Sequence, residues 1–169
     1  MNNIKLFITD IDGVWTDGGM YYSNDGSEVK KFNTSDSAGI IFCRLLGIEV
    51  CIISGENSKA LRNRAKKLKI SKCYTGIKNK VEVAEIIINE MKISWDEVAF
   101  IGDDLNDIKL FRKVGLSACP YTSSEYIKRE VDWIIETKGG EGAFRHFVEK
   151  FLENNNLLEK AINLYLENN

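Results

Sequence analysis

The chain has 169 residues, of which 44% are hydrophobic and 28% charged, a balance typical of one soluble globular domain with a sizeable core. Its net charge of -2 leaves no basic surface for nucleic acid, so we expect no nucleic-acid partner. No apolar run approaches the length of a membrane span, which argues against a membrane protein.

Strand-like and helix-like segments alternate along the chain, and this alternation predicts an α/β fold with a parallel sheet and right-handed crossovers. The sheet strands are expected at residues 4–9, 48–53, 73–75, 98–101, 115–118 and 132–135. The helices are expected from residue 35 or 36 to 46, at 57–67, 79–91, 105–113 and 123–130, and after a glycine loop up to about 154. We therefore predict a three-layer, doubly wound, Rossmann-like sheet.

A hairpin interrupts this alternation early in the chain. Residues 20–23 and 28–32 alternate in polarity on either side of Asn24-Asp25-Gly26, which is a strong hairpin signal. We expect residues 18–32 to form a small flap.

The end of the chain is a separate amphipathic stretch at residues 155–169. Its apolar side chains recur at helical spacing and share one face, which comprises Leu158, Ala161, Ile162, Tyr165 and Leu166. We expect one domain over residues 1–154, followed by this tail.

The cysteines and the single histidine give no sign of a metal or disulfide framework. Cys43, Cys51, Cys73 and Cys119 have no ligand-like spacing, and the chain begins in a strand without the pattern of a signal peptide. They indicate reduced thiols of a cytoplasmic protein. His146 lies on a predicted helix, and one histidine argues against mechanisms that depend on several.

Acidic side chains follow the first predicted strand. Asp10 and Asp12 are two residues apart in Asp10-Ile11-Asp12-Gly13, directly after an apolar run. Two carboxylates held close together repel each other unless a cation or a shared proton offsets the repulsion. Ser54-Gly55, Lys80 and the stretch 102–107 follow later strands or begin later helices. Because parallel strands place their ligands at their carboxyl ends, we expect these residues to form one site.

These residue types suit phosphoryl transfer with Mg²⁺, which prefers hard oxygen ligands. Asp10 could attack phosphorus to form an aspartyl phosphate, and Asp12 could protonate the leaving alkoxide and later activate water. Ser54, Gly55 and Lys80 would hold the transferring phosphoryl group. Asp103 would complete the metal site with Asp10 and the backbone carbonyl of Asp12. The acids expected to support these ligands from behind are Asp104 and Asp107.

The chain resembles phosphatases of the haloacid dehalogenase superfamily, which have D-x-D-G-x-x-T, a strand-terminal Ser, a Lys and G-D-D-x-x-D in this order. The match spans residues 4 to about 150. It implies the same nucleophile, acid/base and metal-ligand roles. Taken alone, each motif is also compatible with a turn or a helix cap.

Three stretches, at residues 10–19, 31–40 and 139–145, are similar to a narrower group of that superfamily. This group comprises capless phosphatases that act on 3-deoxy-D-manno-octulosonate 8-phosphate or 2-keto-3-deoxynononate 9-phosphate. Its members are tetramers in which part of one subunit covers the site of the next. The intervals between the motifs hold no room for a cap domain, so the resemblance implies a homotetramer whose hairpin and glycine loop are the covering pieces.

Substrate choice within the group depends on a few positions. Octulosonate enzymes usually have Asn-Val-Arg-Asp-Gly where this chain has Asn33-Thr34-Ser35-Asp36-Ser37, and Arg where it has Glu56. These departures favour the nine-carbon branch, with the eight-carbon and N-acylneuraminate 9-phosphates as alternatives. A sugar acid also carries a carboxylate, for which Arg64, Lys67 and a neighbour's Arg145 are candidate cations.

Two other classes of function stay open from the sequence. A phosphorylatable switch similar to a receiver domain also uses clustered Asp, Ser, Lys and Mg²⁺, but its acceptor Asp ends a later strand. Domains of the resembling group also occur attached to sialic-acid cytidylyltransferases, which allows a non-catalytic interaction role. Every catalytic position is intact in this chain, which favours an enzyme.

Overall fold

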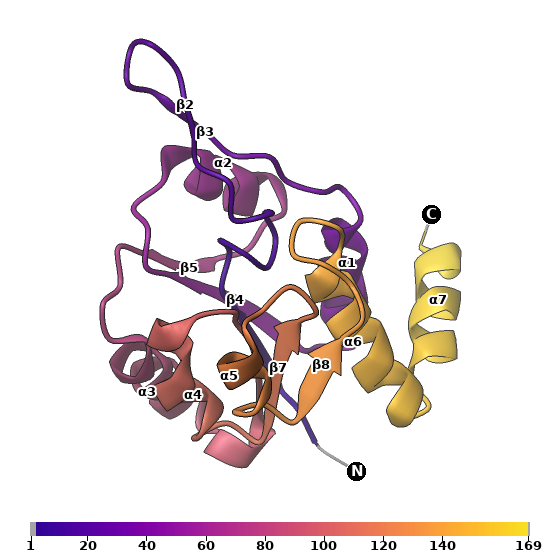
Figure 1. Cartoon of the computed structure of the whole chain (residues 1–169). Helices are drawn as coiled ribbons and strands as arrows, with labels where there is room; N and C mark the ends of the chain where they lie inside the picture. Colours follow the sequence, from indigo (N-terminus) through magenta and orange to yellow (C-terminus); the bar gives the residue numbers. More distant parts are fainter. Residues whose placement is uncertain (1–2, 169) are drawn as a thin grey trace.

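Six apolar segments form the parallel strands of one sheet in the computed structural model, which describes residues 3–168 (Figure 1). The four inner strands are buried on both faces, which explains why they read as nearly continuous apolar runs, whereas the two edge strands are only partly buried. The strands are β1 (Leu6–Thr9), β4 (Glu49–Ser54), β5 (Lys72–Thr75), β6 (Val98–Ile101), β7 (Leu116–Pro120) and β8 (Trp133–Ile135).

The strand order is β5-β4-β1-β6-β7-β8, with β1 at the centre. The last residue of β1, Thr9, lies opposite Ile52 of β4 and Ile101 of β6. The chain runs outward from β1 to one edge and then returns to β6 on the other side of β1. Loops after β1 and β6 therefore diverge at the carboxyl edge, which is where open α/β sheets bind ligands.

Helices cover both faces of this sheet and give the predicted three-layer, doubly wound fold. The helices α1 (Asp36–Leu45), α2 (Lys59–Lys67) and α6 (Ala143–Asn154) contribute to the core on one face. The helices α3 (Lys80–Met91), α4 (Ile108–Phe111) and α5 (Glu125–Lys128) contribute to the core on the other. Phe7 of β1 packs edge to face against Phe147 and Phe151 of α6, with ring centroids 5.3 and 5.4 Å apart.

Two of the predicted helices are shorter than expected. The one predicted at 123–130 is α5 (Glu125–Lys128). The segment predicted at 105–113 begins as a 3₁₀ turn, η2 (Leu105–Asp107), and continues as α4 only to Phe111. Asp104 caps this turn and Asp107 bonds back to it, so the backbone is committed to a tight turn before the α-helix begins. A capping box joins Ser94 and Glu97 around η1 (Trp95–Glu97).

The hairpin strands are β2 (Tyr21–Tyr22) and β3 (Glu28–Val29), much shorter than the predicted 20–23 and 28–32. A two-stranded ribbon has no second layer to bury its side chains, so little of it is held in regular pairing. The hairpin projects from the body of the molecule at the top of Figure 1.

Helix α7 (Leu158–Glu167) packs beside α1 and α6 (Figure 1). Ala161 is buried and Leu158 contacts the core, whereas Ile162 and Leu166 of the same predicted face are exposed. Apart from the hairpin, the described residues form no further domain between the sheet strands, as expected for a capless fold. No helix within residues 3–168 combines the length and apolar character that crossing a lipid bilayer requires.

Candidate active site

A cavity of about 250 Å³ opens at the carboxyl edge of the sheet, above the ends of β1, β4 and β6. Five carboxylate side chains line it, those of Asp10, Asp12, Glu56, Asp103 and Asp104. Among the described residues, no lysine or arginine is exposed in the walls of this cavity, and Lys80 lies buried beneath Asp10. The cavity therefore needs positive charge from a bound cation or from outside its own walls before it can accept an anion.

The floor of the cavity is a buried triad of two aspartates and a lysine. The ammonium Nζ of Lys80, the first residue of α3, lies 2.6 Å from Oδ2 of Asp10 and 2.6 Å from Oδ1 of Asp107. Burial acts to lower the pKa of Lys80, but the two carboxylates raise it above its ordinary value. Lys80 is therefore a cation fixed between two acids, and the backbone N–H of Ile11 donates to Asp10 Oδ1 at 2.7 Å.

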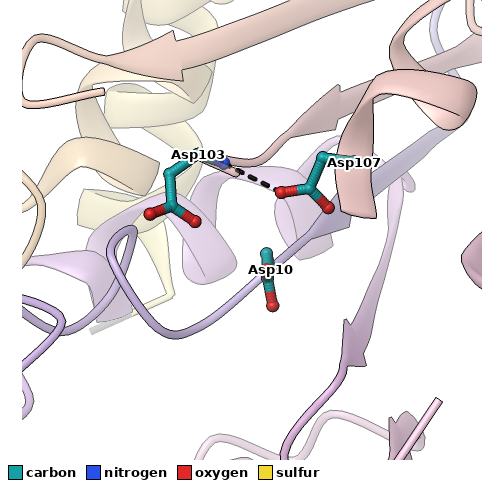
Figure 2. A group of neighbouring side chains, drawn as sticks. All are labelled: Asp10, Asp103 and Asp107. Carbon is teal, nitrogen blue, oxygen red and sulfur yellow. Dashed lines mark hydrogen bonds between the residues drawn. The ribbon is translucent and has the colours of Figure 1, made fainter. Parts of the chain in front are cut away.

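A third acid, Asp103, completes a cluster with Asp10 and Asp107, in which one carboxylate oxygen from each residue lies within 4.8 Å of those from the other two. Figure 2 shows Asp103, which follows β6, and Asp107, the last residue of η2, joined by a hydrogen bond, with Asp10 beside them. The backbone N–H of Asp103 donates to Asp107 Oδ2 at 2.9 Å. Burial, together with the neighbouring carboxylates of Asp10 and Asp107, raises the pKa of Asp103 to about 8.

Burial likewise raises the pKa of Asp10 to about 7, although the ammonium of Lys80 opposes this effect. Carboxylates that are costly to ionise together are the expected state of a cation site without its cation. The donor set is made of carboxylate oxygens, so it fits a hard divalent ion such as the predicted Mg²⁺.

Asp12 lies at the wall of the cavity and its two oxygens have different surroundings. Oδ1 accepts from Lys30 Nζ at 2.6 Å and from the Thr16 hydroxyl at 3.3 Å. Oδ2 is buried and has no hydrogen-bond partner within residues 3–168. The Asp12 carboxylate is thus held through Oδ1 alone.

The loop that carries Asp10 and Asp12 is held by close backbone packing. Gly13 has a φ of +79°, and a Cβ there would lie 1.9 Å from Asp103 Oδ2, so only glycine lets the two loops meet. The indole N–H of buried Trp15 donates to the Thr9 hydroxyl at 2.9 Å, and that hydroxyl donates to the Asp10 carbonyl at 2.6 Å. The glycine loop packs on the other side, where a Cβ on Gly139 would overlap the Gly13 carbonyl.

Several residues predicted for the site do line this cavity. Ser54, at the end of β4, is buried, and its hydroxyl accepts from the Glu56 N–H at 3.3 Å. Gly55 and the exposed Glu56 form the adjacent wall. Asp104 is exposed at the opposite wall, where its carboxylate caps the turn after β6 by accepting from the Leu105 N–H at 2.7 Å.

The predicted stretch 33–37 lies elsewhere, at the start of α1. Asn33 donates to the Gly140 carbonyl at 3.2 Å and accepts from the Ser35 N–H at 3.0 Å. Asp36 is fully buried and accepts from the Arg145 N–H at 3.2 Å. Burial raises the pKa of Asp36 to about 6. The remaining predicted members, Thr34, Ser35 and Ser37, line a second cavity with Arg145.

The predicted cations of α2 also lie outside the acidic cavity of this chain. Arg64 Nη2 donates to the Asn33 carbonyl at 3.2 Å, and Lys67 is exposed at the last residue of the helix. The sequence interpretation missed two residues near the acids, Asn106 in the cavity wall and Lys30 in contact with Asp12. Asn106 lies inside the recognised 102–107 stretch, whereas nothing in the hairpin sequence points to the contact of Lys30.

Known proteins that are similar to this chain in sequence and fold identify its family. A family model described as haloacid dehalogenase-like hydrolase matches residues 74–146. The chain is 35% identical over 159 residues to the 3-deoxy-D-manno-octulosonate 8-phosphate phosphatase of Escherichia coli strain K12, a match that covers 94% of this chain and 85% of that protein.

Solved structures agree with this assignment. The phosphatase of the same name from Yersinia pestis superposes with a TM-score of 0.90 at 35% identity, over 94% of this chain and 85% of that one. The one from Moraxella catarrhalis, solved with a magnesium ion, a phosphate ion and KDO, gives 0.92 at 32% identity, over 97% and 94%. The chain therefore belongs to the haloacid dehalogenase superfamily, within its capless sugar-acid phosphatases, and is a phosphoric monoester hydrolase.

Proposed function

We propose that this enzyme is a Mg²⁺-dependent phosphatase that hydrolyses a phosphorylated 2-keto-3-deoxy sugar acid through an aspartyl phosphate on Asp10. The observation that carries this proposal is the position of Asp10 at the cavity floor. Lys80 and the Ile11 N–H hold its two oxygens at 2.6 and 2.7 Å, which fixes the carboxylate in one orientation. A nucleophile held this way needs little reorganisation before it attacks.

The residues account for both halves of the reaction. Asp10 attacks phosphorus, the bond from phosphorus to the alkyl oxygen breaks, and the proton of the Asp12 carboxyl goes to the leaving alkoxide. Water then attacks the phosphorus of the acyl phosphate, its proton goes to Asp12, and inorganic phosphate leaves with Asp10 restored. Ser54 and the backbone beside Gly55 lie where they can donate to the phosphoryl oxygens.

Asp10, Asp103 and the backbone carbonyl of Asp12 would hold the magnesium ion. When bound, the ion neutralises the phosphoryl oxygens so that an anionic nucleophile can approach them. Asp107 supports this group from behind, since one of its oxygens accepts from Lys80 and the other from the Asp103 N–H. Asp104 caps the turn that presents Asp103.

The substrate class follows from the relatives and from the charge of the cavity. The relatives are named for an eight-carbon sugar-acid phosphate. Such a substrate has a carboxylate as well as a phosphate, but among the described residues no basic side chain is exposed in the cavity walls of one chain, and Lys80 beneath them is already paired with Asp10 and Asp107. We infer that a second subunit of a homotetramer supplies the cation, with Arg64, Lys67 and Arg145 as candidates that lie outside this chain's own cavity.

Within this class we propose 2-keto-3-deoxynononate 9-phosphate as the preferred substrate. Glu56 is exposed at the cavity wall, where its carboxylate can accept from several hydroxyls of a polyol but would repel a second carboxylate. The names of the relatives favour 3-deoxy-D-manno-octulosonate 8-phosphate as the second candidate.

The test is kcat/KM with Mg²⁺ on the eight-carbon, nine-carbon and N-acetylated nine-carbon phosphates side by side. We expect the nine-carbon 9-phosphate to give the highest value. A preference for the eight-carbon phosphate would select the second candidate, and no phosphate release from any of the three would contradict the substrate class.

A further inference from the structure

Lys30, the residue after β3, is a buried lysine in a hairpin that is otherwise exposed. Its side chain is 1% exposed, and its ammonium lies 2.6 Å from Asp12 Oδ1 and 3.0 Å from Glu28 Oε1. Lysine is almost never buried unless it is paired, so these two acids are what keep it there. Lys30 is not among the residues that line the acidic cavity, but it contacts Asp12, which does line it.

The contact makes the two oxygens of Asp12 unequal. Oδ1 accepts from both Lys30 and Thr16, whereas Oδ2 is buried without a partner in the described residues. An ammonium has donors only, so an oxygen bound to it cannot also present a proton to it. Lys30 and Thr16 therefore fix the direction in which the Asp12 carboxylate is turned.

We propose that Lys30 is a positioning residue that holds the Asp12 carboxyl in the orientation from which it exchanges a proton with the leaving oxygen of the substrate. This inference rests on the proposed function, and specifically on the role of Asp12 as acid and base. In the first step the proton moves from the Asp12 carboxyl to the alkoxide as the bond from phosphorus to the alkyl oxygen breaks. In the second step the same carboxyl takes a proton from the attacking water.

Contacts behind Lys30 support this orientation. Glu28 accepts from Lys30, and the hydroxyl of buried Ser58, the residue that caps α2, bonds the Glu28 carboxylate. This series of side-chain contacts runs from α2 through Glu28 and Lys30 to Asp12, and it joins the base of the hairpin to the wall of the cavity. Each member is fixed by the next, which is how a rigid shell keeps a reacting group within a narrow range of positions.

The experiment compares two leaving groups in the full-length enzyme. The first substrate is the sugar-acid phosphate that the wild type hydrolyses best, whose alkoxide must be protonated, and the second is p-nitrophenyl phosphate, whose phenolate leaves without a proton. Because kcat/KM includes the steps only up to the first irreversible cleavage, the ratio of the two values reports protonation of the leaving group. The ratio is also independent of any inactive fraction of protein.

We expect Lys30→Met to lower kcat/KM for the sugar-acid phosphate about 100-fold and for p-nitrophenyl phosphate less than about threefold. Lys30→Arg keeps the charge and a donor, so it should recover most of the ratio. The matched control is Lys31→Met, whose side chain is 73% exposed, and it should leave the ratio within about twofold. If Lys30→Met is insoluble, Lys30→Gln replaces it, and a fall of about fivefold or more in the ratio is expected.

Equal losses on the two substrates in the Lys30 variants would overturn the proposal and leave Lys30 as an anchor of the hairpin. Asp12→Asn separates this failure from failure of the proposed function. If Asp12→Asn lowers the ratio and the Lys30 variants do not, only the inference about Lys30 is wrong. If Asp12→Asn also leaves the ratio unchanged, the acid role of Asp12 is wrong.

Discussion

The cavity floor and the hairpin lie near each other but are built in opposite ways. Asp10, Lys80 and Asp107 in the floor are 5%, 2% and 0% exposed and are joined by hydrogen bonds of 2.6 Å. In the hairpin, Tyr22 and Val29 are 66% and 55% exposed, and each strand has only two residues.

This difference suggests that the floor carries out the reaction and that the hairpin serves to cover an active site. Asp10 and Lys80 are 70 residues apart in the chain and meet because the sheet places the end of β1 beside the start of α3. The floor is therefore complete in one chain. Several exposed apolar side chains in one small ribbon instead suggest a surface that another subunit covers, which agrees with the proposed tetramer.

The largest effect should come from the floor. Asp10→Asn removes the nucleophile, because an amide cannot form the acyl phosphate, and we expect kcat to fall by about 10⁴-fold or more. The matched control in the hairpin is Asp25→Asn, since Asp25 is exposed and bonds only locally to the Ser27 N–H at 2.9 Å. Phosphate release measures both, and an Asp10→Asn enzyme with more than about a tenth of the wild-type rate would contradict the mechanism.

The sequence predicted that Asp10 and Lys80 would lie at one site, because the carboxyl ends of parallel strands and the helices that follow them meet at one edge of the sheet. Each buried strand is an apolar run, and the residue after it must lie at the carboxyl edge of a parallel sheet. The hairpin strands were predicted too long, because alternation of polarity shows that a ribbon can form but not how much of it stays paired. The position of Asp36 was also hidden, since its partner, the Arg145 N–H, lies 109 residues away.

A second effect concerns magnesium and pH. The folded chain raises the pKa of Asp10 to about 7 and of Asp103 to about 8 from an ordinary 3.8. Without metal, the folded state binds these protons more tightly than the unfolded state. Their contribution to stability is therefore present below the ordinary pKa and lost as pH rises through 7 to 8.

Mg²⁺ competes with these protons, so its affinity should rise with pH over the same window. We expect its Kd to fall between about pH 6 and pH 8.5, by up to about tenfold per pH unit for each proton that binding releases, as measured by calorimetric titration. The gain in Tm on adding Mg²⁺ should grow in parallel. Binding that is independent of pH across this range would show that the floor acids are already ionised without the metal.

A smaller effect should come from the wall between floor and hairpin. Glu56→Ala removes a carboxylate that we propose to read polyol hydroxyls, so kcat/KM for the nine-carbon phosphate should fall by about 1–3 kcal/mol in transition-state stabilisation. The eight-carbon phosphate should lose less, because fewer matched hydroxyls are involved. Glu90→Ala, at an exposed position of α3, is the matched control. Equal losses on both substrates would make Glu56 a structural residue.

Lys30 shows why part of the wall could not be predicted. Its partner Asp12 is 18 residues away and lies in a loop, so neither a helical nor a strand period connects the two. The motif identifies Asp12, but the direction of its carboxylate depends on a side chain from a hairpin whose length the sequence did not set. Contacts of this kind, between residues far apart in the sequence, can be found only once the structure gives the positions of the loops.

The smallest effect on the chemistry should come from the hairpin surface, and it tests the comparison most directly. Tyr22→Ser changes an exposed side chain, so the floor should be unaffected and turnover of p-nitrophenyl phosphate should stay within about threefold. If the hairpin meets another subunit, sedimentation velocity should show species smaller than those of the wild type, and kcat/KM for the sugar-acid phosphate should fall by about tenfold as the second subunit's cation is lost. Tyr126→Ser, at a 48% exposed position of α5, is the matched control and should change neither quantity. A Tyr22→Ser enzyme with wild-type assembly and full activity on the sugar-acid phosphate would mean that Tyr22 takes no part in the contact between subunits. A wild type that is monomeric and fully active at assay concentration would show that the floor and its own loops suffice for the whole reaction.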